Sequence, residues 1–260
     1  MKILVPVKQV ASLDGDFTLA DDGGLREGEP TWRLNEWDEF SLEAAVQLSE
    51  AADGEVVVVS VGPERVEEAL RACLARGADR AIRVWGEGLA GAADPLSLAS
   101  VLAAVARAEA PALILCGAQS ADAAHAATGV ALAGLLDLPR VAVVSAIERD
   151  GRHLTVQREL EGGAVEVLRI APPCLLTVQT GINRPRQPTL RAIRQARMKP
   201  VAVAGPAELA LEPAVVLAGA GSRTVGLRER PRSAGAKLLE GAPADVAARI
   251  TEIVKESLAR

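Results

Sequence analysis

Residues 112–139, ALILCGAQSADAAHAATGVALAGLLDLP, decide the fold expected of this chain. An apolar strand is followed by Gly117, a short polar loop and an alanine-rich helix, for which Ser120 and Asp122 are candidate caps. The first N–H groups of a helix have no partner within it, so a helix that starts beyond a buried strand can bind an anion such as phosphate. An ordinary strand-to-helix connection has the same composition, and the local pattern alone favours that simpler interpretation.

Short β-branched runs alternate with helical periodicity on either side of this stretch. The expected strands are residues 3–7, 55–61, 81–85, 112–116 and 141–147. The expected helices are residues 38–51 with Asn35 or Asp38 as cap, a helix between Pro63 and Gly77, one that opens with Asp94 and Pro95, and the helix of the opening stretch. This rhythm predicts an α/β fold with a doubly wound, mainly parallel sheet and a ligand beyond the carboxyl ends of its strands.

The pattern changes after residue 147. Residues 153–160 and 164–170 alternate around Gly162 and Gly163, which predicts an inserted β-hairpin with a two-residue turn. Residues 174–180 predict one more buried strand, and a short helical stretch covers about 190–197. We expect two units: an α/β domain over residues 1–199, with a loop at about 181–199, and an extended arm over 200–260. The arm ends in an amphipathic helix, residues 243–258, which we expect to pack on a partner subunit.

Composition excludes several classes of protein. The net charge of −5, with five aromatic residues and no tyrosine, argues against nucleic-acid binding. Cys73, Cys116 and Cys174 lie far apart in apolar contexts and are expected to be buried thiols in a reducing compartment. The apolar runs are shorter than the roughly 20 residues that span a bilayer, and strand-like sequence begins at Lys2. We therefore expect a soluble cytoplasmic protein with no membrane insertion.

Motifs for catalysis are missing from the sequence. There are two histidines, no cysteine at metal-ligand spacing, and no nucleophile or phosphate-loop motif. His125 lies in the ligand-facing stretch, but a solvent-facing or packing histidine is the simpler interpretation. Four acidic residues resemble a calcium loop without its final glutamate, and we expect a solvated loop there: Asp14, Asp16, Asp21 and Asp22. Any chemistry is therefore expected to reside in a bound cofactor.

A basic segment stands out in this acidic chain. Residues 167–207 contain no acidic side chain but seven cationic ones: Arg169, Arg184, Arg186, Arg191, Arg194, Arg197 and Lys199. Leu190 and Ile193, three residues apart, are expected to share one helical face amid these charges. The simpler interpretation is a solvated face; the alternative is a docking surface for an acidic partner.

Seven segments in this order and spacing make the chain similar to one known family. They are MKILVPVKQV, LNEWDEFSLEAA, VVVVSVGP, RGADRAIRV, CGAQSAD with TGVALAGLLDLP, RELEGGAVEVLR, and NRPRQPTLRAIRQARMKP. The chain resembles the β subunits of the electron transfer flavoproteins over essentially its whole length. The resemblance implies a Rossmann-like fold of the adenine-nucleotide-hydrolase type and a heterodimer whose α subunit holds most of an FAD. It implies an electron carrier, not an enzyme, that takes electrons from acyl-CoA or related dehydrogenases and passes them to a membrane quinone reductase.

The resemblance also implies specific site residues. AMP would bind in a pocket formed by Pro6, Asn35, Glu36, Trp37, Asp38, Val61, Asp122, Ala123, Ala124, His125, Ala126, Ala127, Thr128, Gly129, Val130, Ala131, Leu132 and Ala133. In this pocket, Asp38 or Asn35 would accept hydrogen bonds from the adenine or ribose, and Thr128 with the helix-start amides would hold phosphate.

Partner contacts follow from the same resemblance. Leu190 matches the anchor of a loop that grips dehydrogenases, with Arg191, Ile193 and Arg194 beside it. Glu166 matches an acidic residue that contacts the flavin-bearing domain of the α subunit.

Two alternatives remain open at this point. Electron-bifurcating members of the family hold a second FAD, but residues 124–129 read AHAATG instead of their characteristic run, which favours AMP. A stand-alone adenine-nucleotide-binding regulator of the universal stress type is the other, although the chain lacks that family's late glycine-rich phosphate signature.

Overall fold

The structure is a computed structural model that describes residues 1–12, 31–90, 92–226, 235–236 and 238–259. The four aspartates of the calcium-like loop, between residues 14 and 22, lie outside the described residues.

The described residues form a nine-stranded sheet in the order β11–β5–β4–β1–β6–β10–β7–β8–β9. The strands are β1 (Lys2–Pro6), β4 (Glu55–Val61), β5 (Arg80–Val84), β6 (Leu113–Gly117), β7 (Arg140–Asp150), β8 (His153–Glu159), β9 (Val165–Ile170), β10 (Cys174–Val178) and β11 (Val201–Ala204). Pairing is parallel from β11 to β7 and antiparallel from β7 to β9. The predicted doubly wound, mainly parallel sheet is confirmed. A small separate sheet joins β2 (Gln9–Ser12) to β3 (Thr31–Leu34).

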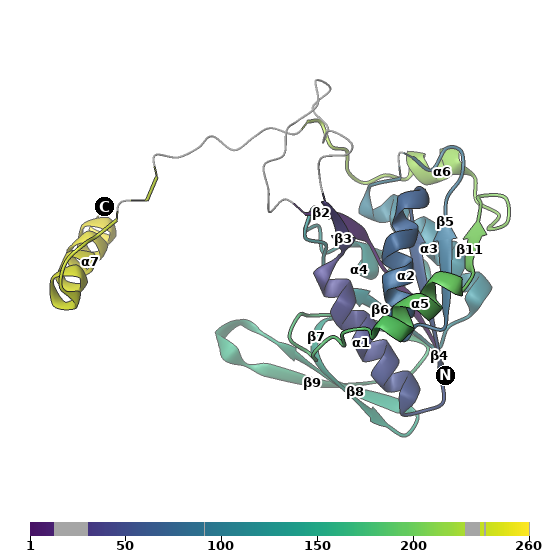
Figure 1. Cartoon of the computed structure of the whole chain (residues 1–260), viewed down its shortest axis with the longest axis horizontal. Coiled ribbons are helices and arrows are strands. Elements are labelled where there is room, and N and C mark those ends of the chain that lie inside the picture. Colours follow the sequence, from purple (N-terminus) through teal and green to yellow (C-terminus); the bar gives the residue numbers. More distant parts are fainter. Residues whose placement is uncertain (13–30, 91, 227–234, 237, 260) are drawn as a thin grey trace.

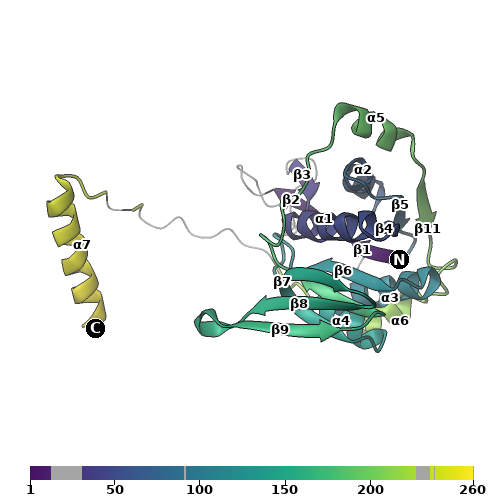
Figure 2. The ribbon, with the colours of Figure 1, turned by 90° about the horizontal axis from the view of Figure 1, so that it is seen from below.

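Helices cover both faces of the sheet (Figure 2). One face carries α1 (Glu36–Glu50), the short turn η1 (Glu64–Val66), α2 (Glu67–Ala75) and α5 (Leu190–Met198). The other carries α3 (Pro95–Glu109), α4 (Thr128–Leu135) and α6 (Pro213–Ala218). Successive residues of a strand point to opposite faces, so Ile3 joins the first hydrophobic cluster and Leu4 the second. Burial on both faces explains the valine-rich runs of the central strands.

Asp94 caps α3 as predicted and also fixes the chain after α6. Its carboxylate accepts hydrogen bonds from the backbone N–H groups of Leu96 and Ser97 in the first turn of α3. It also accepts from the backbone N–H groups of Gly221 and Ser222 and from the Ser222 hydroxyl. Burial alone would raise the pKa of Asp94, but these donors lower it to about 2.

The predicted hairpin forms a longer turn than expected. The strands are β8 and β9, but the backbone N–H of Leu160 bonds to the carbonyl of Ala164, so residues 160–164 make the connection. Gly162 and Gly163 both have positive φ within it, at 76° and 79°. The turn therefore keeps the two glycines and adds residues on both sides of them. The hairpin projects from the edge of the body (Figure 2).

The segment beyond Pro200 contains more regular structure than the sequence indicated. β11 pairs with β5 at the edge of the main sheet, and Val216 of α6 is buried in the second hydrophobic cluster. Residues 201–218 therefore pack on the α/β body, past the expected boundary at residue 199. The runs are four and six residues long, too short for hydrophobic periodicity to reveal.

The chain ends in α7 (Pro243–Leu258), which has Pro243 in its first turn as predicted. Every described side chain of this helix is at least partly exposed, and Figure 1 shows it apart from the body. In the described part of the chain, each helix is too short or too polar to cross a membrane.

Candidate functional site

A cavity of about 330 Å³ opens where β1, β4 and β6 end. Pro6, Val61 and Gly117, the last residues of these three strands, all line it. The chain runs from β1 outward to β4 on one side, and β6 lies on the other side of β1, so this is the switch point of the sheet. Doubly wound proteins bind ligands at such a point, and the volume lies at the lower end of the roughly 300–1,000 Å³ range of ligand pockets.

Asn35 fastens the loop that follows β6. The residue precedes α1, and its side chain is 1% exposed. Its amide nitrogen donates to the carbonyl of Gln119 at 2.9 Å, and its amide oxygen accepts from the backbone N–H of Ala121 at 3.0 Å. The predicted cap role is therefore wrong for the Asn35 side chain, which bonds to a loop 84 residues away instead of to its own helix.

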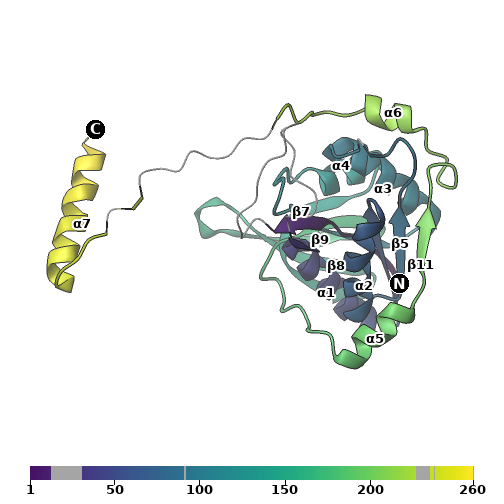
Figure 3. The same ribbon diagram turned by 45° about the horizontal axis from the view of Figure 1, so that its top comes forward.

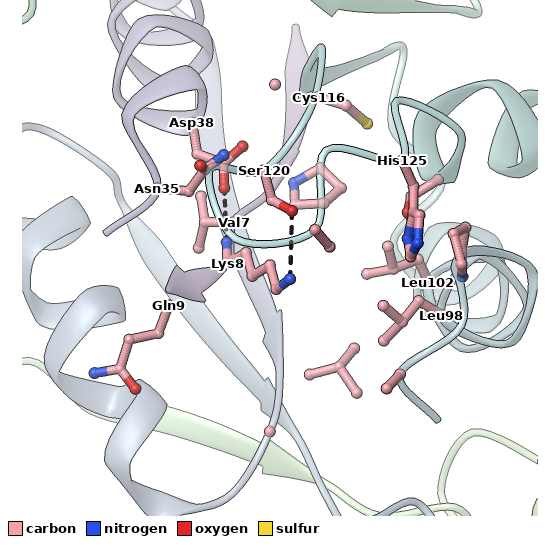
Figure 4. Close-up of a pocket in the computed structure, with 18 of the residues that line it drawn as sticks. Val7, Lys8, Gln9, Asn35, Asp38, Leu98, Leu102, Cys116, Ser120 and His125 are labelled. Carbon is pink, nitrogen blue, oxygen red and sulfur yellow. Dashed lines mark hydrogen bonds between the residues drawn. The ribbon is translucent and has the colours of Figure 1, made fainter. Parts of the chain in front are cut away.

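Asp38 lies beneath the same corner and is 5% exposed. Its Oδ2 atom accepts a hydrogen bond from the backbone N–H of Lys8 at 2.7 Å (Figure 4). Removal from water raises the pKa of this carboxyl to about 7, although hydrogen bonds from Lys8, Asn35 and Gly117 oppose the shift. The carboxyl therefore joins β1, α1 and β6 at the edge of the cavity, which Asp38 helps to line.

Gly117 allows the end of β6 to lie close to the first turn of α1. A Cβ atom on residue 117 would lie 2.3 Å from Oδ1 of Asp38 and 2.8 Å from Cβ of Trp37. Any side chain there would push β6 away from α1. The glycine is thus required by packing against α1 and also lines the cavity.

Lys8 holds the loop from the cavity side. Its Nζ atom lies 3.3 Å from Oγ of Ser120 (Figure 4). The same atom lies 2.7 Å from Oδ1 of Asp122. The predicted caps are therefore wrong: Ser120 and Asp122 bond to Lys8, and α4 begins six residues after Asp122, at Thr128. The intervening backbone contains two non-glycine residues with positive φ, Ala124 at 50° and Ala126 at 51°.

The start of α4 faces the cavity. Ala126 has positive φ, and the next residue, Ala127, has φ −117° and ψ −28°. Alternation of left- and right-handed residues turns consecutive N–H groups towards one side and forms an anion-binding concavity. The helix N-terminus that follows adds N–H groups with no partner inside the helix. Gly129 brings this turn close to the sheet, since a Cβ there would lie 2.8 Å from Cγ2 of Thr177.

The remaining wall of the cavity is apolar. Trp85, Leu89, Leu98 and Leu102 line it. His125 is exposed and lies beside Leu98 and Leu102, across the cavity from Asn35 and Asp38 (Figure 4). The site thus combines an apolar wall, a cluster of backbone donors and the cations Lys8 and Arg65, which suits a flat apolar ring that carries an anionic group.

The structure gathers ten of the sequence-predicted pocket residues at the cavity. They are Pro6, Asn35, Asp38, Val61, Ala123, His125, Ala126, Ala127, Thr128 and Gly129. The other eight predicted residues, all among those described, lie outside the lining: Glu36, Trp37, Asp122, Ala124, Val130, Ala131, Leu132 and Ala133. Trp37 bonds to Gln179 instead, and Leu132 and Ala133 are buried in the core.

Sequence reasoning missed several lining residues. Lys8 lies two residues beyond Pro6, the last residue of the first strand, and this position could have identified it. Gln9 lies in β2, Arg65 in η1, and Trp85 and Leu89 in the connection from β5 to α3, and no local motif links these three places.

The predicted partner-binding residues lie elsewhere on the surface. Leu190 is 76% exposed on α5, while Ile193 is half-buried against the core, so the two do not share an exposed face. Met198, at 85% exposure, is the apolar residue that lies on the outer side with Leu190. Arg191 and Arg194 are exposed beside them. Glu166, on β9, pairs with Arg158 at 2.5 Å.

A doubly wound sheet with a cavity at its switch point defines the class of α/β proteins that bind ligands beyond their strand ends. Within that class, the model of the electron transfer flavoprotein domain matches residues 23–209. The chain is 43% identical over 261 residues to the electron transfer flavoprotein subunit beta of Methylophilus methylotrophus, and the alignment covers 98% of each chain. The human subunit beta is 35% identical over 216 residues, which is 82% of this chain and 84% of the human one.

The chain therefore belongs to the electron transfer flavoprotein family, among its β subunits. The family consists of electron carriers associated with flavin, and the name of a β subunit implies an α partner.

Asp38 makes the stability of the fold depend on pH. Because its pKa is about 7 in the folded chain and about 3.8 for a carboxyl in water, the folded state binds the extra proton between these values. We compare the free energy of unfolding of wild type with that of Asp38→Asn. The wild-type value minus the variant value should fall by about 1–3 kcal/mol as pH rises from 5 to 8. Urea unfolding of both full-length chains at several pH values measures this difference. A difference that stays constant or grows with pH would contradict the placement of Asp38 as a buried, protonatable group.

Proposed function

We propose that this chain is the β subunit of a cytoplasmic, heterodimeric electron carrier and that its cavity binds AMP. The observation that carries the proposal is the cluster of backbone donors at residues 126–129, which faces a cavity with an apolar wall. An α subunit would hold most of the FAD, which supplies the one-electron and two-electron chemistry of the complex. Electrons would come from acyl-CoA or related dehydrogenases and go to a membrane quinone reductase.

The cavity fits a mononucleotide. The phosphate would lie against the N–H groups of residues 127–129 and the Thr128 hydroxyl, near the ammonium of Lys8. The adenine would lie along the apolar wall that contains Trp85 and Leu89. Asn35 and Asp38 are expected to act by holding the loop, because their side chains already bond to the protein.

AMP fits better than a second FAD. The cavity of about 330 Å³ lies near the lower limit for ligand pockets, and a dinucleotide would require room for a second nucleotide half. The sequence AHAATG at residues 124–129 supports the same choice.

The α subunit would contact two apolar surfaces that the body leaves exposed. The projecting hairpin presents Leu160, Val165 and Val167, which are 45%, 52% and 60% exposed. The terminal helix α7 presents Ile250, Ile253, Val254 and Leu258, which are exposed and recur at helical spacing. An amphipathic helix with its apolar side in water is stabilised when it packs on a partner. We therefore propose that α7 packs on the α subunit.

Dehydrogenases would dock on α5, which lies on the opposite face of the sheet from α4 (Figures 2 and 3). Leu190, Arg194 and Met198 follow one another at four-residue spacing along the outer side of this helix. An exposed apolar residue beside exposed arginines suits a transient partner with an acidic rim.

Co-expression with a candidate α subunit tests the proposal as a whole. A yellow heterodimer that releases AMP on denaturation, identified by chromatography, is the expected result. A colourless monomer would contradict the electron-carrier function, and release of FAD in a two-to-one ratio to the heterodimer would replace AMP with a second flavin.

The backbone at Ala126 provides a sharper test of the nucleotide site. Ala126→Val places a β-branched side chain at a left-handed φ of 51°, which is strained by about 1–3 kcal/mol, so the loop should relax and AMP affinity should fall roughly tenfold or more. Ala126→Gly keeps the same conformation without strain and should bind AMP as wild type does. Titration calorimetry of AMP against the nucleotide-free heterodimer compares the three proteins. Equal affinity of the valine variant and wild type would remove this loop from the phosphate site.

Leu190→Ala tests the docking surface. Burial of one leucine is worth about 1.5–3 kcal/mol, so the KM for a dehydrogenase partner should rise roughly 10- to 100-fold while flavin content stays unchanged. Val203→Ala, on the exposed edge strand β11, removes an exposed apolar side chain elsewhere and serves as the control. If both variants transfer electrons as wild type does, Leu190 is not an anchor.

A further inference from the structure

The segment that presents Leu190, residues 187–198, is held against α1 by Arg186, which directly precedes it. The guanidinium of Arg186 contacts two carboxylates of α1 at once. Its Nε and Nη2 atoms lie 2.8 Å and 3.1 Å from the oxygens of Glu43, and its Nη1 and Nη2 atoms lie 2.7 Å and 3.0 Å from those of Glu50. The backbone N–H of the same arginine also donates to Glu43, at 3.1 Å. Both forks of the guanidinium are therefore used within the protein.

The far end of the segment is fastened to α2 and to the turn that follows it. Arg71 of α2 donates to the carbonyls of Ala196, Arg197 and Lys199 where α5 ends. The ammonium of Lys199 donates in turn to the carbonyl of Ala78. Between the two ends, the inner side of α5 packs on the first hydrophobic cluster, so the outer side that carries Leu190 has a fixed orientation.

Arg186 differs from its neighbour Arg184 although both belong to the basic segment. Arg184 is exposed, and within the described residues no ion pair involves it. The side chain of Glu43 is only 6% exposed, whereas that of Glu50 is 60% exposed. The sequence therefore predicted one basic surface where the structure has two different roles: outward charges and an inward fastening.

The energetic importance of Arg186 comes from Glu43. An exposed ion pair contributes little to stability, so the Glu50 contact alone would be minor. Loss of the cation beside a buried carboxylate is much more damaging, because the carboxylate stays desolvated without its countercharge. The segment would then detach or rearrange, and its residues would have to be ordered again each time a partner docks, which weakens binding.

We propose that Arg186, together with Glu43 and Glu50, is a positioning device that holds the Leu190 face of α5 in the orientation required to dock an electron-transfer partner with an acidic contact surface. This inference rests on the docking role proposed above. Arg186 acts through Leu190 and touches neither the partner nor a cofactor.

A matched pair of variants in the assembled heterodimer tests it. Arg186→Gln and Arg184→Gln remove the same charge from the same loop, two residues apart, so the second reports the electrostatic effect alone. Arg186→Gln should raise the KM for an acyl-CoA dehydrogenase about tenfold or more beyond the effect of Arg184→Gln, with kcat and flavin content unchanged. Amide hydrogen exchange over residues 187–198 should become faster in Arg186→Gln and stay unchanged in Arg184→Gln.

Glu50→Gln provides a second, milder variant in case Arg186→Gln does not assemble. It keeps the buried pair and weakens the exposed one, so it should produce a smaller change of the same kind in both measurements. Equal KM values for Arg186→Gln and Arg184→Gln, or unchanged hydrogen exchange in both Arg186→Gln and Glu50→Gln, would overturn the inference. Failure of the docking role is recognised separately: Leu190→Ala would then leave KM unchanged while the exchange of residues 187–198 still responds to Arg186.

Discussion

The structure depends on a buried polar corner where β1, α1 and β6 meet. Asn35 and Asp38 are both almost fully buried there, and a buried polar group without a partner is strongly destabilising. Their partners are backbone groups of two other segments, the end of β1 and the loop after β6. The hydrogen bonds of Asn35 and Asp38 therefore hold three segments of the chain against one another. Gly117 has no side chain, so it leaves the space for this close contact.

Function follows from what this corner holds in place. The fixed loop leads into two left-handed alanines and the start of α4, so backbone N–H groups are turned to the cavity before any ligand arrives. The proposed AMP site thus uses backbone donors for the anion and leaves the acidic corner beneath it to maintain shape. The proposed partner surfaces lie elsewhere, on the hairpin, α5 and α7, where apolar side chains remain exposed. The proposed nucleotide site and the proposed partner surfaces therefore occupy separate parts of the chain.

The sequence was sufficient for the parts of the fold that depend on local pattern. Valine-rich runs predicted the central strands because residues buried on both faces need no alternation, and Asp94 with Pro95 marked the start of α3 correctly. The assignments that failed depend on contacts between distant segments. Aspartate is a residue type that often caps helices, but Asp122 forms an ion pair with Lys8, which is 114 residues away in the sequence. No local pattern reveals such a contact.

The residues of the candidate site were likewise predictable only where a local pattern determines their position. Residues 123 and 125–129 reached the cavity because they follow a strand end, which is a local rule. Leu98 and Leu102 reach it only through the packing of α3 on the sheet. Arg186 lies against α1 because it pairs with Glu43, 143 residues away in the sequence. Charge counting placed Arg186 with the exposed arginines, since composition does not record which way a side chain points.

A comparison of AMP with adenosine tests the central claim most directly. If backbone donors at residues 126–129 and Lys8 hold a phosphate, the nucleotide-free heterodimer should bind AMP at least about tenfold more tightly than adenosine, which corresponds to one charge-assisted contact of about 1.5–3 kcal/mol. Titration calorimetry of the two ligands under identical salt conditions gives both affinities. Equal affinities would show that the cavity recognises only the nucleoside, and would contradict the account of the loop and the start of α4 as an anion site.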